Sequence, residues 1–410
     1  MSTGAILGLI FVGALVFRIG IIYLYAWNTG LHYEYAEIAK NIIDGHGYSW
    51  GWYGSVPLQP SAAFEPLYTY FLAFFMAILG EPARFIYFSQ VILNALGIYA
   101  AYLLGKHLGD KNGGLMAAGL YAFFPEIASA PTRMVPEAII SGPVLLVFYL
   151  FLKMKSELLN HVITKRFLWL GIFIGLLALM KASMLLLYIA LVLSLLVSGF
   201  KRTPVMKAIM LLSLGVALAV SPWLIRNYII MGKPVFRTTY GFNLWRGNYP
   251  GASGTGRLLP GATREILPSD GYFNLIERNQ PHTEIEIDEF LTREAVRLIK
   301  QDPIRFCTLT AKRIFYFLTF DPSHPLTRNA IYLGGYIFAV VFGLWGAVIL
   351  IKQKGLDISF ILAPLLHLFL YAPVMILPRY RMILVWLLVC LASIPIARVV
   401  VRLGWLTGRG

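Results

Sequence analysis

The sequence predicts an all-α polytopic membrane protein with about ten transmembrane helices and with interfacial helices in two long external loops. Of its 410 residues, 58% are hydrophobic and 13% are charged, whereas soluble domains carry about 25% charged residues. Apolar runs of about 20 residues, the length that crosses a bilayer, recur along the chain. Lys and Arg gather in the short loops between these runs, as the positive-inside rule requires. The net charge of +15 therefore reflects topology and does not indicate nucleic-acid binding.

The basic loops set the expected topology. Five basic loops lie near residues 106–111, 153–166, 201–207, 352–354 and 398–409. All five fall on the cytoplasmic side if residues 65–80 lie in the membrane interface and do not span. That segment is about 16 residues long, which is short for a span. Both termini are then expected in the cytoplasm. The expected spans lie near residues 5–27, 85–105, 114–130, 134–152, 167–180, 183–200, 205–222, 329–351, 357–376 and 382–401.

These spans divide the chain into three parts. Residues 1–222 form an N-terminal transmembrane module that includes the first external loop (28–84), and residues 329–410 hold the C-terminal transmembrane helices. Residues 223–328 form the second external loop. Hydrophobic spacing predicts amphipathic helices over residues 33–44 and 288–300, and basic and aromatic residues alternate over 304–320, as in a helix at the headgroup level. Loops of this length usually carry function.

Ionisable residues on the external side form two sets with complementary chemistry. A carboxylate can take the proton of an acceptor hydroxyl, and arginines bind a phosphate leaving group through their planar fork of donors. Simpler roles stay open, such as the wet face of an interfacial helix, a helix N-terminal acid or a snorkelling cation. The acids are Glu34, Glu37, Glu65, Glu126 and Glu137, and the bases are Arg133, Lys181, Arg226, Arg246, Arg379 and Arg381.

A dense polar and aromatic run follows Gly241 and extends from Asn243 to Asn248. Trp245 offers an apolar face to a sugar ring, with Arg246 and Asn243 beside it, although a turn that only anchors Trp245 at the interface is the alternative. The histidines show no metal-ligand spacing, and Cys307 and Cys390 are far apart. We expect no metal and no cofactor.

Several segments, in order and spacing, resemble the GT-C class of membrane glycosyltransferases, in its branch related to protein O-mannosyltransferases and aminoarabinose transferases. The matching segments are Tyr35–Ala39 with Gly45–Tyr48, Glu65–Tyr68, Pro222–Asn227, Gly241–Asn248 and Arg379–Arg381. The resemblance implies an enzyme of the cytoplasmic (plasma) membrane with its active site facing outside. It implies transfer of a sugar from a polyprenyl-phosphate donor to a lipid, glycan or protein acceptor of the cell envelope, without a bound metal.

One position departs from this pattern. Relatives usually carry an acid about four residues before the tyrosine that matches Tyr35, whereas this chain has Leu31 there, with His32 beside it. Either Glu34 takes the role of that acid or the activity is lost. We predict Glu34 as the catalytic base and Glu137 as a second, positioning acid. By the same resemblance, substrate is bound by Arg226, Asn243, Trp245, Arg246, Arg379 and Arg381.

Two other classes of function compete with this prediction. A lipid or sugar transporter would need repeated halves and broken helices near the midplane, and the sequence shows no repeat. A non-catalytic membrane scaffold is favoured by Leu31. Convergence of Glu34 and the arginines in one site would argue against a scaffold.

Overall fold

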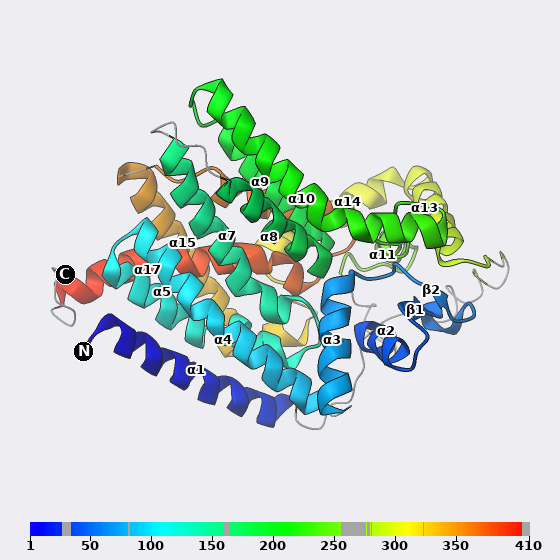
Figure 1. Cartoon of the computed structure of the whole chain (residues 1–410), viewed down its shortest axis with the longest axis horizontal. Helices are drawn as coiled ribbons and strands as arrows, with labels where there is room; N and C mark the ends of the chain where they lie inside the picture. Colours follow the sequence, from blue (N-terminus) through cyan, green and yellow to red (C-terminus); the bar gives the residue numbers. More distant parts are fainter. Residues whose placement is uncertain are drawn as a thin grey trace.

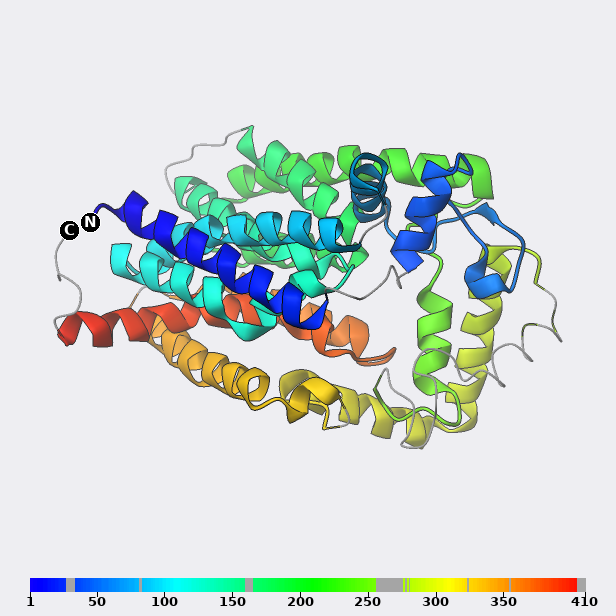
Figure 2. The same cartoon turned by 90° about the horizontal axis from the view of Figure 1, so that it is seen from below.

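The computed structural model is almost entirely helical, as the sequence predicts, and describes residues 1–26, 34–80, 83–158, 165–255, 276, 279, 281–322, 324–353 and 355–403. In this part of the chain the sheet is limited to a short hairpin. Its strand β1 (Ser49–Trp50) pairs antiparallel with β2 (Gln59–Pro60), with Ser49 opposite Pro60. The helices form an elongated bundle with both termini at one end (Figures 1 and 2).

Every predicted span coincides with one or more helices. Within the described residues, six helical segments are long and apolar enough to cross a membrane by themselves: α1 (Thr3–Tyr25), α4 (Ala83–Leu108), α7 (Glu137–Leu158), α10 (Arg202–Met231), α15 (Ala330–Gln353) and the segment Pro378–Arg402, which contains η5 (Pro378–Arg381) and α17 (Met382–Arg402). The other spans correspond to the shorter helices α5 (Lys111–Phe123), α8 (Arg166–Met180), α9 (Leu185–Leu196), which follows η3 (Ala182–Met184), and α16 (Ser359–Tyr371). The number of ten spans therefore stays a prediction.

The predicted span over 114–130 is broken into α5 and the short helix α6 (Pro125–Ser129). Pro125 lacks an N–H, and its ring keeps Phe124 in an extended conformation with φ −66° and ψ 122°. An α-helix cannot continue through such a residue. The turn η2 (Ala130–Thr132) follows, and α7 then starts at Glu137.

Helix α3 (Pro66–Leu79) covers the segment that was expected not to span. It is seen side-on in Figure 1 and end-on in Figure 2, so that it crosses the end of the bundle at a steep angle to α4. Its orientation fits a helix in the plane of the membrane interface. Pro66 begins it, since a proline at the first helical position loses no hydrogen bond.

The two expected external loops build a cap on the end of the bundle opposite the termini (Figure 1). The first loop contributes α2 (Glu34–Ile43), the turn η1 (Trp52–Gly54) and the hairpin. The second contributes α11 (Tyr240–Asn248), α13 (Glu284–Gln301), α14 (Pro303–Leu318) and η4 (Pro325–Arg328). The predicted helix over 288–300 begins earlier, because Thr283 and Glu286 form a capping box at the start of α13. The other two predicted amphipathic helices coincide with α2 and α14.

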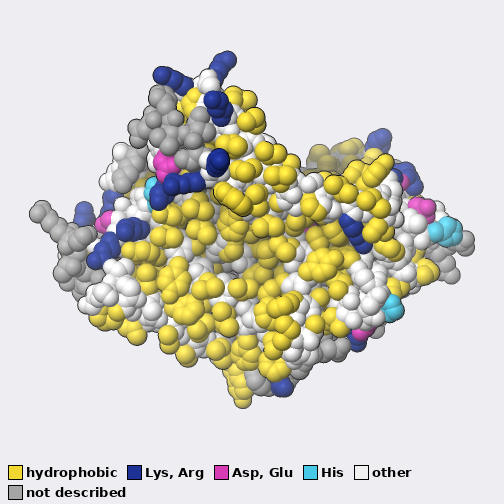
Figure 3. Space-filling model, viewed as in Figure 1, with side chains coloured by type: hydrophobic (Ala, Val, Ile, Leu, Met, Phe, Trp, Pro, Cys, Tyr) yellow, Lys and Arg dark blue, Asp and Glu magenta, His cyan; other side chains and the backbone are white. Residues whose placement is uncertain are grey.

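On the face seen in Figure 3, apolar side chains cover the middle, while Lys and Arg gather towards the ends. Large residues such as Trp169 and Ile331 are 67% and 72% exposed. An exposed apolar belt of this extent suits contact with lipid and would be a liability in water. Inside the bundle, glycines allow close helix contacts, for example where Gly97 of α4 meets Gly142 of α7. Small residues at such contacts are typical of membrane helix packing.

Candidate active site

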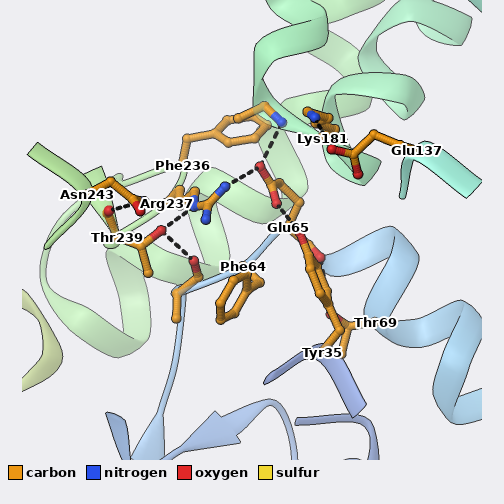
Figure 4. Close-up of polar contacts among 12 residues, drawn as sticks. Tyr35, Phe64, Glu65, Thr69, Glu137, Lys181, Phe236, Arg237, Thr239 and Asn243 are labelled. Atoms are coloured by element: carbon orange, nitrogen blue, oxygen red, sulfur yellow. Dashed lines mark hydrogen bonds and ion pairs between the residues drawn. The ribbon is translucent and has the colours of Figure 1, made fainter. Parts of the chain in front are cut away.

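The buried carboxylate of Glu65 lies where the cap meets the bundle (Figure 4). It accepts hydrogen bonds from the Tyr35 hydroxyl at 3.1 Å and from the Ala182 backbone N–H at 2.7 Å. It also forms an ion pair with Arg237, whose Nη1 lies 3.3 Å away. Four segments that are distant in sequence thus meet at one carboxylate.

A second buried carboxylate, Glu137, lies nearby at the start of α7. It pairs with Lys181, and its Oε1 lies 3.7 Å from Nε of Arg379. Lys181 directly precedes Ala182, so that consecutive residues between α8 and α9 bind the two carboxylates. The Lys181 ammonium also lies 5.3 Å from the ring centroid of Tyr380.

We call these five side chains, Glu65, Glu137, Lys181, Arg237 and Arg379, the charged cluster. Three cations and two carboxylates give it a net charge of +1 when all are ionised. Burial lowers the pKa of Arg237, but the Glu65 carboxylate and nearby tyrosines, Tyr35 and Tyr380 among them, together raise it above its ordinary value. Arg237 therefore stays charged at any physiological pH.

Aromatic rings frame the charged cluster. Tyr371 stacks on Tyr380 with ring centroids 4.1 Å apart, and the Arg379 guanidinium lies 5.7 Å from the Tyr380 centroid. Burial, followed by the Glu65 charge, raises the pKa of Tyr35 well above its ordinary value. Tyr35 is therefore a neutral hydroxyl donor. Cations beside tyrosine faces and hydroxyls form a site that suits an anion.

Of the predicted site residues, Glu137 and Arg379 meet in the charged cluster. Glu34 is the first residue of α2 and is partly exposed, one position before Tyr35. Among the residues that the structure describes, the ion pairs of the charged cluster do not include Glu34. Leu31 and His32, the positions of the sequence departure, lie outside the described residues.

Arg381 lies on the same turn as Arg379 but points to a different group. It is buried, donates hydrogen bonds to the Thr319 carbonyl and to the Tyr332 hydroxyl, and lies 3.8 Å from the Tyr336 ring centroid. The Tyr332 hydroxyl in turn donates to Glu126 at 3.0 Å. Arg381 thus fixes the turn to α15 and to the end of α14.

The guanidinium of Arg226 is also engaged in hydrogen bonds within the protein. Its guanidinium donates to the Ser61 carbonyl at 2.7 Å, to the Tyr48 carbonyl at 3.0 Å and to Asn227 Oδ1 at 2.8 Å. These contacts hold the first external loop against α10.

The α11 residues lie in the cap. Asn243 donates to the Thr239 carbonyl at 2.7 Å, and the buried Trp245 stacks on Tyr249 with centroids 5.6 Å apart. Arg246 is half-buried in the last turn of the helix.

Glu284 at the start of α13 positions Arg237. Its buried carboxylate accepts from the Ser61 hydroxyl at 2.6 Å, from the Ala62 N–H at 2.8 Å and from the Thr238 hydroxyl. Thr238 is the neighbour of Arg237, so this junction fixes where Arg237 enters the site. Burial raises the pKa of Glu284.

The sequence did not identify Arg237 or Glu284, which lie in the second loop without a motif around them. Glu65 and Lys181 were candidates by type but were not assigned to the site. In the described part of the chain, no three His, Cys, Asp or Glu side chains converge as a metal site would require. Two carboxylates and three cations do converge, although Glu34 is not among them.

Comparison with known proteins agrees with this architecture. Residues 59–225 match the family of dolichyl-phosphate-mannose-protein mannosyltransferases. The archaeal oligosaccharyltransferase AglB from Archaeoglobus fulgidus, solved with an inhibitory peptide and a dolichol-phosphate, superposes with a TM-score of 0.59 at 15% identity, over 98% of this chain and 52% of that one. The resemblance to GT-C membrane glycosyltransferases is confirmed.

A second structure of the Archaeoglobus fulgidus oligosaccharyltransferase, tethered to an acceptor peptide containing the NVT sequon, gives a TM-score of 0.59 at 15% identity, over 97% and 50% of the two chains. This chain therefore spans about half the length of the solved structures that it matches. The comparison with curated proteins finds no significant match. The family match includes Glu65, Glu137 and Lys181, whereas Arg237 and Arg379 lie beyond it.

Proposed function

We propose that this GT-C protein transfers a sugar from a polyprenyl-phosphate-linked donor to an acceptor at the non-cytoplasmic face of the plasma membrane. The observation that carries the proposal is the charged cluster with its net charge of +1. A phosphodiester between a lipid and a sugar carries one negative charge, which this site would neutralise. Isolated charges are expensive in a buried site, so complementarity of this kind favours an anionic ligand.

The proposed reaction is a single displacement. An acceptor oxygen forms a bond to the anomeric carbon, the bond from that carbon to the phosphate oxygen breaks, and the acceptor proton passes to a base. The configuration at the anomeric carbon inverts. The leaving lipid phosphate gains a second negative charge, so Arg237, Arg379 and Lys181 stabilise the transition state more than the ground state.

The base requires a carboxylate that is free to accept a proton. Glu65 and Glu137 are both paired with cations, and Glu65 accepts two further hydrogen bonds. We keep Glu34 as the proposed base because it directly precedes Tyr35, whose hydroxyl reaches Glu65. In this proposal Glu137 positions Lys181 and Arg379.

The remaining predicted residues take distinct roles in the proposal. Asn243, Trp245 and Arg246 of α11 flank the sugar. Arg226 and Arg381 hold the backbone around the site, as their bonds to carbonyl oxygens indicate.

Binding of a fluorescent polyprenyl phosphate to the purified full chain tests the proposal. Arg379→Ala should weaken binding by about tenfold or more, the cost of losing one charged hydrogen-bond partner, and Arg379→Lys should restore only part of it, because lysine lacks the planar fork. Arg381→Ala should instead reduce folded yield. The matched control is Arg297→Ala on the exposed face of α13. Unchanged affinity of the Arg379→Ala variant for polyprenyl phosphate would show that the phosphate does not bind at this site.

A second candidate is a scaffold that binds lipid phosphate without transferring sugar. It is favoured by Leu31 and by the pairing of both cluster carboxylates with cations. Sugar release from a radiolabelled polyprenyl-phosphate sugar in the presence of membrane acceptors distinguishes the two. Tight donor binding with no transfer would support the scaffold.

A further inference from the structure

A cavity lies among helix ends at the end of the bundle where α17 finishes. Figure 1 shows that this end of the bundle is opposite the cap. The cavity has a volume of about 320 Å³ and lies between the ends of α4, α15 and α17 and the start of α5. Its apolar wall consists of Leu108, Leu350, Ile394, Ala397 and Val401. This volume is at the small end of the range for ligand pockets, about 300 to 1,000 Å³.

Two arginines, Arg398 and Arg402, line the cavity from consecutive turns of α17. Arg398 donates to Gln353 Oε1 at 2.6 Å, which leaves its other donors available. The side chain of Arg402 forms no hydrogen bond or ion pair with any residue that the structure describes. The one acid of the lining, Asp110, accepts the Gly113 N–H at 2.8 Å as the N-cap of α5. The cavity therefore has net positive charge.

The position of the cavity indicates a ligand with an apolar tail. Val399 and Leu403, beside the two arginines on α17, are 43% and 60% exposed. Cations lie at this end of the molecule, next to the apolar belt (Figure 3). The expected topology assigns this end to the cytoplasm, where the membrane leaflet carries acidic lipids.

We propose that this cavity binds the acidic headgroup of a membrane phospholipid, with the phosphate between Arg398 and Arg402 and the acyl chains along the outer surface of α17. Basic pockets between transmembrane helices on the cytoplasmic side suit such headgroups. A zwitterionic phospholipid has no net charge to match the two arginines. This site is separate from the charged cluster and does not depend on the proposed transfer.

Native mass spectrometry of the purified full chain with phosphatidylglycerol or phosphatidylcholine tests the proposal. A surface cation contributes about fivefold to such binding, so Arg398→Gln with Arg402→Gln should weaken phosphatidylglycerol binding by about 30-fold. The matched control is Arg202→Gln with Lys207→Gln at the exposed start of α10. The control should bind phosphatidylglycerol like the parent chain, and the parent should bind phosphatidylcholine far less.

A neutral substitution distinguishes the cavity from general surface charge. Ala397→Leu narrows the cavity without changing charge and should also weaken phosphatidylglycerol binding. If this variant binds phosphatidylglycerol as well as the parent chain does, or if the control pair loses as much affinity, the cavity is not the binding site. The lipid would then be attracted by the surface charge in general. Equal binding of the two lipids, or displacement by millimolar inorganic phosphate, would overturn the phospholipid headgroup as the ligand.

Discussion

Replacing Arg237 by Ala should destabilise the fold by about 3 kcal/mol, because it leaves the Glu65 carboxylate buried without its cation. Breaking a buried ion pair from one side costs about 3–5 kcal/mol. The lower end applies here, since Glu65 keeps its bonds to Tyr35 and Ala182 and the Arg237 side chain is 31% exposed. At about 1.2 °C per kcal/mol for a chain of this length, the thermal midpoint in detergent should fall by about 4 °C.

A double-mutant cycle isolates this interaction. Glu65→Gln removes the buried charge, so Arg237→Ala combined with Glu65→Gln should be more stable than Arg237→Ala alone, with a coupling of about 2 kcal/mol. Arg297→Ala breaks an exposed pair on α13 and should change stability by less than about 1 kcal/mol. If the stability changes of the two single variants simply add, or if Arg237→Ala and Arg297→Ala have equal thermal midpoints, Arg237 and Glu65 do not form a stabilising buried ion pair.

Three further predictions concern catalysis, topology and pH. Glu34→Gln should lower sugar transfer by about 100- to 10,000-fold with donor binding retained, while Glu37→Gln should have far less effect; equal losses in rate would exclude Glu34 as the base. In a chain without native cysteines, a cysteine at Thr203 should react with a membrane-impermeant reagent only after permeabilisation, and one at Thr255 in intact cells; the reverse would exclude the ten-span topology. Burial raises the pKa of Asp288 to about 7, so its stabilising contribution should be present below about pH 4 and be lost as pH rises through 7. Asp288→Asn should make the free energy of unfolding depend less on pH over this window, and an unchanged pH profile in this variant would contradict the shift.

The fold could be predicted largely from sequence because bilayer length and loop charge act locally along the chain. The steep angle between α3 and α4 agrees with the loop charges, which place residues 65–80 in the membrane interface. The end of α5 shows what the length of an apolar run does not predict. Pro125 breaks the predicted span over 114–130, and the apolar run alone conceals this break. A span is predicted from the average hydrophobicity of a window of residues. Such an average does not show that a single proline within the window ends the helix.

The site was only partly predictable, because its contacts connect segments far apart in sequence. Glu137 and Arg379 were identified by type and position at helix ends. Arg237 has no local signal, since its partner Glu65 is 172 positions away. Arg381 was grouped with Arg379 by proximity in sequence, whereas the 3₁₀ turn directs the two side chains to different groups.

The Glu284 junction has a consequence for the order in which this protein is made. Its carboxylate binds Ser61 and Ala62, which are synthesised 223 and 222 residues earlier. These groups of the first loop therefore have no Glu284 partner until seven of the expected spans have been translated and inserted. Arg237 reaches Glu65 only when that closure occurs. The charged cluster is thus completed late in biogenesis, and it also requires Arg379. A chain interrupted before Glu284 would carry only the first seven expected spans and an open cap.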